Sequence, residues 1–202
     1  KKDWSICLSE NEKMKIIENG SRDFDVSIIV SEKPSSLVIE NYNIQGLSDK
    51  FSLFWTYNCH PQLAQNELSG VAVWAILLST LQHFEKKKKF NRGYLFAIGP
   101  ETIGAIALID FFYKHNLKPE NAVVLTCVGA ESNFLSVQSS RKEHSYLQKA
   151  IEKALKDNDI KKYKVDGFDM RGSDERQFDF PSVNIETSYF STKKYHQYPQ
   201  YH

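Results

Sequence analysis

The sequence is poor in features that would assign a function at once. It has 3 cysteines and 2 methionines, and its 26 basic and 25 acidic residues leave a formal net charge of +1. This balance excludes the strongly basic surface that binds nucleic acid through charge. The one dense basic run, residues 86–89, is explained as the solvated end of a helix. We therefore expect no nucleic-acid partner.

Long apolar runs and paired cysteines are also absent. The longest apolar segment, residues 68–81, is shorter than the roughly 20 residues that a membrane-spanning helix needs. The first residues lack the apolar core of a signal peptide. Cys7, Cys59 and Cys127 form no CxxC motif, so we expect reduced thiols, with Cys59 and Cys127 buried. These features predict a cytoplasmic protein that does not bind membranes.

The sequence does contain material for a large core. Hydrophobic residues make up 41% of the 202 residues and aromatic residues 13%, with no linker, repeat or low-complexity segment. We expect a single domain over residues 1–202. The missing initial methionine and the abrupt "YPQYH" end are interpreted as the boundaries of a fragment of a longer chain.

Apolar segments alternate with helical patterns along the chain. Strands are expected at residues 25–31, 36–44, 50–58, 93–99, 121–129, 133–140, 163–168 and 182–189. Helices are expected at 69–85, 102–115 and 143–157, the first of them apolar on both sides and so expected to be buried between layers. Apolar strands alternating with helices are typical of an α/β sandwich around a largely parallel sheet.

Polar residues follow these strands, where α/β folds collect their chemistry. The candidate site residues are His60, Asn66, Glu67, Glu101, Glu131, Asp174, Glu175, Arg176 and His202. Imidazoles and carboxylates are the donors of a hydrolytic zinc site, which also needs an open position for water and a carboxylate base.

Each candidate also has a purely structural explanation. His60 precedes a proline and could be an extended loop residue, while Glu101 could compensate a helix dipole. Asn66 could cap a helix, the 174–176 triplet could be a surface ion-pair cluster, and His202 could belong to a frayed end. The spacing alone leaves both interpretations open.

Six segments in a fixed order carry a family resemblance. They are "WSICLSEN" (4–11), "CHPQLAQNELSG" (59–70), "PETIGAIALI" (100–109), "TCVGAESNFLSVQSSR" (126–141), "GSDERQFDFPSVNI" (172–185) and "YPQYH" (198–202). Together they resemble the bacterial aminopeptidase-like proteins of the zinc (co-catalytic) aminopeptidase superfamily, often encoded with polysaccharide-biosynthesis genes. The resemblance covers nearly the whole chain and implies a three-layer sandwich: a mixed, mostly parallel sheet of about eight strands with helices on both faces.

The resemblance also implies roles for individual residues. His60 and His202 would be metal ligands, and Glu101 the catalytic base or a neighbouring ligand. Asp174 lies in a loop that would close over the site. We assign Asp174, Glu175, Arg176 and Glu67 to substrate binding.

Two departures from the family pattern affect the expected metal site. Asn66 stands where relatives usually carry a metal-bridging aspartate, and Ala130 where they carry another aspartate ligand. Glu67 and Glu131, each one residue further on, are candidate substitutes, and we include Asn66 and Glu131 among the candidate ligands. Losing two carboxylates argues against two zinc ions, because the site is poorer by two negative charges.

Two functions from different classes follow. The first is a metal-dependent, aminopeptidase-like hydrolase of a small amide or a peptide N-terminus, with zinc as its cofactor and a partly degenerate metal site. A sugar amide is an alternative substrate, given the polysaccharide genes beside relatives. The second is a catalytically inactive pseudo-peptidase that binds a ligand or partner.

Overall fold

The computed structural model describes residues 6–20, 23–60, 62–130, 134–142, 144–168 and 173–192. The chain divides into two compact units, Lys1–Ser36 and Leu37–His202, and each is described by itself. The expectation of a single domain stays a prediction.

The first unit contains one helix that the sequence pattern above does not predict. Helix α1 (Glu10–Asn19) begins with a capping box, in which Ser9 Oγ accepts the Glu12 N–H and Glu12 Oε2 accepts the Ser9 N–H. None of its residues is buried. It ends at Gly20, whose φ of 67° is left-handed.

The prediction of a strand at residues 25–31 is wrong. Residues 23–39 form no regular secondary structure, and the side chains of Ile28, Ile29 and Val30 are 74–96% exposed. β-Branched residues favour a strand only where a neighbouring strand supplies hydrogen-bond partners, and the sheet described below contains no strand from this segment.

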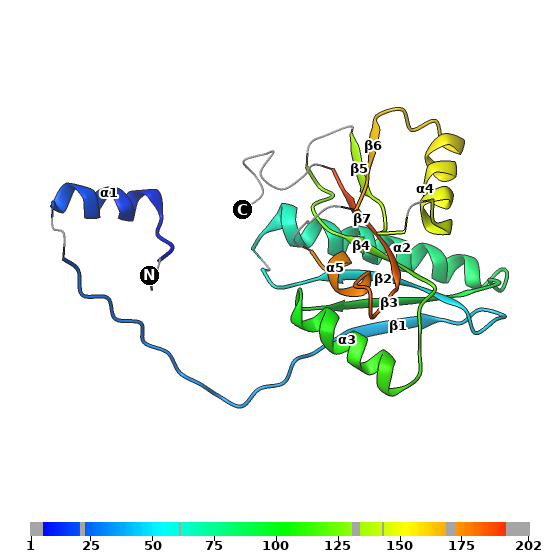
Figure 1. The fold of residues 1–202 in the computed structure, drawn as a ribbon, viewed down its shortest axis with the longest axis horizontal. Helices are drawn as coiled ribbons and strands as arrows, with labels where there is room; N and C mark the ends of the chain where they lie inside the picture. The colour runs from blue at the N-terminus through cyan, green and yellow to red at the C-terminus, as the bar shows by residue number, and fades with distance from the viewer. Residues whose placement is uncertain are drawn as a thin grey trace. The chain divides into compact units, whose positions relative to one another are not determined.

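The second unit is built on a seven-stranded sheet in the order β1-β3-β2-β4-β7-β5-β6 (Figure 1). The strands are β1 (Glu40–Ile44), β2 (Phe51–Tyr57), β3 (Gly93–Gly99), β4 (Asn121–Leu125), β5 (Leu135–Gln138), β6 (Tyr163–Asp166) and β7 (Glu186–Ser191). Four neighbouring pairs are parallel, and two, β1–β3 and β5–β7, are antiparallel. The α/β fold is confirmed. Within the part of the chain that the structure describes, the sheet is mixed and has seven strands, where about eight were expected.

Helices cover both faces of this sheet. They are η1 (Ala64–Leu68), α2 (Ser69–Glu85), α3 (Ile103–Lys114), α4 (Tyr146–Asp157) and α5 (Glu175–Phe178). Side chains of β2 alternate between the two faces: Trp55 packs in the core with α3 and α5, and Phe54 in the core with α2 and α4. The expected three-layer arrangement is therefore present.

Helix α2 begins and ends where the sequence predicts, but it is not buried on all sides. Ile76 and Phe84 are 66% and 51% exposed, because the sheet covers only one side of the helix. The helix starts very close to the sheet: a Cβ on Gly70 would lie 2.4 Å from the Leu125 carbonyl oxygen. Among the described residues, no helix is both long and apolar enough to cross a membrane.

Candidate functional site

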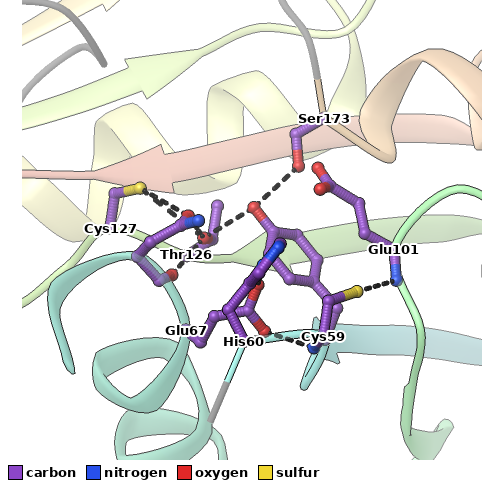
Figure 2. A network of polar contacts seen from close by, with 9 residues as sticks. Cys59, His60, Glu67, Glu101, Thr126, Cys127 and Ser173 are labelled. Atoms are coloured by element: carbon purple, nitrogen blue, oxygen red, sulfur yellow. Dashed lines mark hydrogen bonds and ion pairs between the residues drawn. The ribbon is translucent and has the colours of Figure 1, made fainter. Parts of the chain in front are cut away.

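Polar side chains from distant segments meet beyond the carboxyl ends of β2, β3 and β4. These strands are parallel neighbours, so their carboxyl ends lie at one edge of the sheet. We call the following residues the carboxyl-end cluster: Tyr57, Cys59, His60, Glu67, Glu101, Thr126, Ser173 and Asp174. Figure 2 labels six of them: Cys59, His60, Glu67, Glu101, Thr126 and Ser173.

The π-helix η1 contributes the acidic residue Glu67 to the cluster. Its wide turn is closed by the bond from the Leu68 N–H to the Leu63 carbonyl oxygen (3.3 Å), five residues back. Two successive side chains, Asn66 and Glu67, are buried in this turn, at 4% and 1% exposure. The sequence predicts only a polar turn here, and the π-helix decides where both side chains point.

Glu67 holds the segment that follows β2. Its Oε2 accepts the Cys59 N–H at 2.6 Å, and its Oε1 lies 3.0 Å from His60 Nδ1. The Glu67 side chain is fully buried, whereas the His60 ring remains 55% exposed (Figure 2). A buried carboxylate therefore orients an imidazole that is open on its other side.

Asn66 makes different contacts. Its Oδ1 lies 3.3 Å from Cys127 Sγ, and its carbonyl oxygen accepts the Thr126 hydroxyl (2.7 Å) and the Cys127 N–H (3.3 Å). The side-chain oxygen expected to bind metal thus faces the thiol that follows β4. The residue after it, Glu67, is the one that reaches His60.

Glu101 lies in the short loop between β3 and α3. Its N–H donates to Cys59 Sγ at 2.8 Å (Figure 2). Burial, and then the nearby Asp174 carboxyl, raise the pKa of Glu101 to about 7, although a hydrogen bond with Ser173 and the nearby His60 act in the opposite direction. A carboxyl with a pKa near neutrality suits a general base.

Asp174 joins three elements. Its Oδ2 accepts the Trp55 Nε1–H at 2.5 Å from β2, and its Oδ1 accepts the Thr102 N–H at 2.7 Å just before α3. Burial raises the pKa of Asp174 to about 6 despite these two hydrogen bonds, and it raises the pKa of the neighbouring Glu175 to about 7. Asp174 and Glu175 are buried and only Arg176 is exposed, so the 174–176 triplet is not simply a surface ion-pair cluster.

A chain of hydroxyl groups crosses the cluster and was not expected from the sequence. Thr126 Oγ1 and Ser173 Oγ lie 2.8 Å and 3.3 Å from Tyr57 Oη, and Ser173 also hydrogen-bonds to Glu101. Burial raises the pKa of Tyr57 far above its usual value, so its phenol is neutral at physiological pH. The sequence held one signal for this chain of hydroxyl groups: Tyr57 ends the apolar strand β2, and Thr126 directly follows the apolar strand β4.

The expectations for Glu131, for His202 and for the cysteines have different outcomes. Glu131 and His202 lie outside the described residues, so their roles as ligands stay predictions. None of the three cysteines forms a disulfide, and Cys127 is buried as expected. Cys59 is exposed, contrary to expectation, because β2 ends at Tyr57 and leaves Cys59 in the loop beyond it.

The donor types in the cluster fit zinc, but the described residues supply only part of a ligand set. One imidazole and several carboxyl groups are donors that zinc accepts. Within the described ranges, no group of three or more His, Cys, Asp or Glu side chains is arranged to hold a metal ion. The nearby Asp174 carboxyl raises the pKa of Glu101. A bound cation would offset the electrostatic repulsion between these two carboxyl groups.

The α/β fold is similar to that of aminopeptidase-like proteins, as comparisons with known proteins show. A Clostridium acetobutylicum protein provisionally named as a polysaccharide biosynthesis protein with an aminopeptidase-like domain is 31% identical over 185 residues. The match covers 92% of this chain but 41% of the relative, so the chain spans less than half of that protein's length.

Solved structures show the same fold. A crystal structure from C. acetobutylicum, provisionally described as a peptidase, matches with a TM-score of 0.70 and 30% identity, covering 79% of this chain and 36% of that one. A zinc aminopeptidase from Bacillus subtilis matches with a TM-score of 0.60 and 14% identity, covering 81% and 42%. The chain belongs to the family described as a domain of unknown function (DUF4910), whose model matches residues 6–202.

Proposed function

We propose that this chain is the hydrolase domain of an aminopeptidase-like enzyme that acts on a peptide N-terminus or a small amide with the help of zinc. One observation carries the proposal: His60, oriented by Glu67, lies in the same cluster as a Glu101 carboxyl whose pKa is raised to about 7. The names of the relatives support a peptidase-like role.

Each described residue has a defined part in this reaction. His60 would hold the metal through Nε2, together with ligands from outside the described residues. Zinc, when bound, would act as a Lewis acid toward the scissile carbonyl. Glu101 would take a proton from the attacking water and return it to the leaving amine. Asp174 would keep the loop before α3 in place through the Thr102 N–H.

A second function, a pseudo-peptidase that binds a ligand or partner, is favoured by a different observation. Asn66 Oδ1 faces Cys127 Sγ, and the described residues alone complete no three-ligand group. A chain with this arrangement would keep the fold and bind without hydrolysing.

The first test measures zinc and hydrolysis together. Protein purified without chelators is analysed for metal content and assayed on a panel of aminoacyl amides, aminoacyl sugars and short peptides. We expect at least one equivalent of zinc and turnover of one of these classes. Glu101→Gln should lower the rate by about 10²–10⁴-fold while zinc remains bound.

A matched control is Glu120→Gln. Glu120 pairs with Lys50 and Arg92 and its loss also removes one carboxylate, but it precedes β4 at the opposite end of the strand from the cluster. Its rate should equal that of the parent. Protein that contains no zinc and hydrolyses none of the panel would contradict the hydrolase and support the pseudo-peptidase.

A further inference from the structure

The contact between His60 and Glu67 determines more than the position of a side chain. A neutral imidazole carries its proton on one of two nitrogens, and only the other nitrogen can bind a metal ion. Glu67 Oε1 lies 3.0 Å from Nδ1 of His60. Because an ionised carboxylate oxygen only accepts hydrogen bonds, a hydrogen bond between these two atoms requires the proton on Nδ1, and a neutral ring then keeps its lone pair on Nε2.

Glu67 is itself held in place. Its second oxygen accepts the Cys59 N–H at 2.6 Å, so the carboxylate cannot rotate without breaking a backbone hydrogen bond. The Glu67 side chain is fully buried, and both of its oxygens are occupied by the protein. The substrate-binding role that the sequence suggested for Glu67 stays a prediction.

We propose that Glu67 is a positioning residue that fixes His60 as the Nδ1–H tautomer, so that Nε2 is the atom offered to zinc. The inference rests on the proposed function only in naming zinc as the partner of Nε2. Carboxylates that orient metal-binding histidines in this way typically change metal affinity by about 10–100-fold when removed. Here the orienting residue comes from the π-helix η1, seven positions after the histidine it holds.

Glu67→Gln gives a sharp test, because an amide has one oxygen and one NH2 group. The fixed Cys59 N–H requires the oxygen, which turns the NH2 group toward His60 Nδ1. Nδ1 must then accept a hydrogen bond, and the proton moves to Nε2. The variant should therefore switch the tautomer of His60 while its shape hardly changes.

The tautomer is read in chelator-treated protein by NMR of 15N-labelled histidine, with the His60 signals identified by their loss in His60→Asn. We expect Nδ1–H in the parent and in Glu120→Gln, and Nε2–H in Glu67→Gln. Zinc affinity, measured by competition with a chromophoric chelator, should fall about 10–100-fold in Glu67→Gln and stay unchanged in Glu120→Gln.

Two outcomes would overturn the proposal. One is a parent protein in which His60 is the Nε2–H tautomer or an even mixture. The other is a folded Glu67→Gln variant with the parent's tautomer and zinc affinity. If the parent binds no zinc, the proposed hydrolase fails, while the tautomer measurement still decides the role of Glu67. If Glu67→Gln does not fold, the parent tautomer alone decides.

Discussion

At the scale of single residues, Glu101, Asp174 and Glu175 make the stability of the metal-free protein depend on pH. Burial raises the pKa of each to between about 6 and about 7 in the folded protein, whereas the unfolded chain has the ordinary values near 4. Between about pH 4 and pH 7 the unfolded chain therefore binds fewer protons than the folded one. The contribution of these groups to the free energy of unfolding falls as the pH rises through this window and is constant above it.

Glu101→Gln should remove part of this pH dependence. We expect the metal-free variant to be more stable than the parent at pH 8, by about 1–3 kcal/mol, and equally stable near pH 3, where the Glu101 carboxyl is mostly neutral in both the folded and the unfolded state. Urea unfolding at several pH values in the presence of a chelator measures the difference. A difference that does not change with pH would contradict the assignment of a raised pKa to Glu101.

At the scale of secondary-structure elements, the approach of α2 to the sheet sets the position of the cluster. Gly70 lies in the first turn of α2, where an added Cβ would come within 2.4 Å of the Leu125 carbonyl oxygen and 2.8 Å of Thr56 Oγ1. Ser69, the residue before it, donates its hydroxyl to the Gln65 carbonyl oxygen and accepts the Val128 N–H. The first turn of α2 therefore links η1 to the loop after β4.

Gly70→Ala should separate α2 from the sheet and destabilise the fold. We expect a loss of about 1–3 kcal/mol in the free energy of unfolding, as for other insertions of a methyl group into packed cores, and weaker zinc binding because η1 shifts with the helix. Gly167→Ala is the control, since its Cβ would meet no atom within 4 Å. Denaturant melts of the two variants check this, and equal stabilities would show that the α2–sheet contact adapts.

At the scale of the whole molecule, the two units contribute unequally to the core. Every described residue from 6 to 36 is exposed, and both core clusters consist of residues from the second unit. The free energy of folding should therefore come almost entirely from residues after Ser36.

Deleting residues 1–36 should leave the free energy of unfolding of the second unit within about 0.5 kcal/mol of the parent value, because neither core cluster contains a residue of the first unit. Circular dichroism should lose only the helical signal of α1. Thermal and urea melts of the shortened chain provide the measurement. A large drop in stability would instead support the expectation of one domain over residues 1–202.

Local patterns in the sequence determined much of this architecture. The limits of α2 and β3 agree with the sequence prediction to the residue, because apolar periodicity and short apolar runs between turns are local signals. The rule that polar residues collect after parallel strands brought His60, Glu67, Glu101 and Asp174 into consideration, and the structure places all four in one cluster.

Only the tertiary structure decided what these residues do. The π-helical turn directs Glu67, and not Asn66, to His60. Burial raises the pKa of Asp174, and its hydrogen-bond partner Trp55, which acts in the opposite direction, lies 119 positions away in the sequence. The apolar segment at 25–31 forms no strand because pairing depends on a neighbour that local composition does not specify. The tertiary structure determines which distant segments meet, and so it determines the hydrogen-bond partners, the burial and the electrostatic neighbours of each residue. The periodicity of the sequence could therefore identify candidate site residues but could not assign their roles.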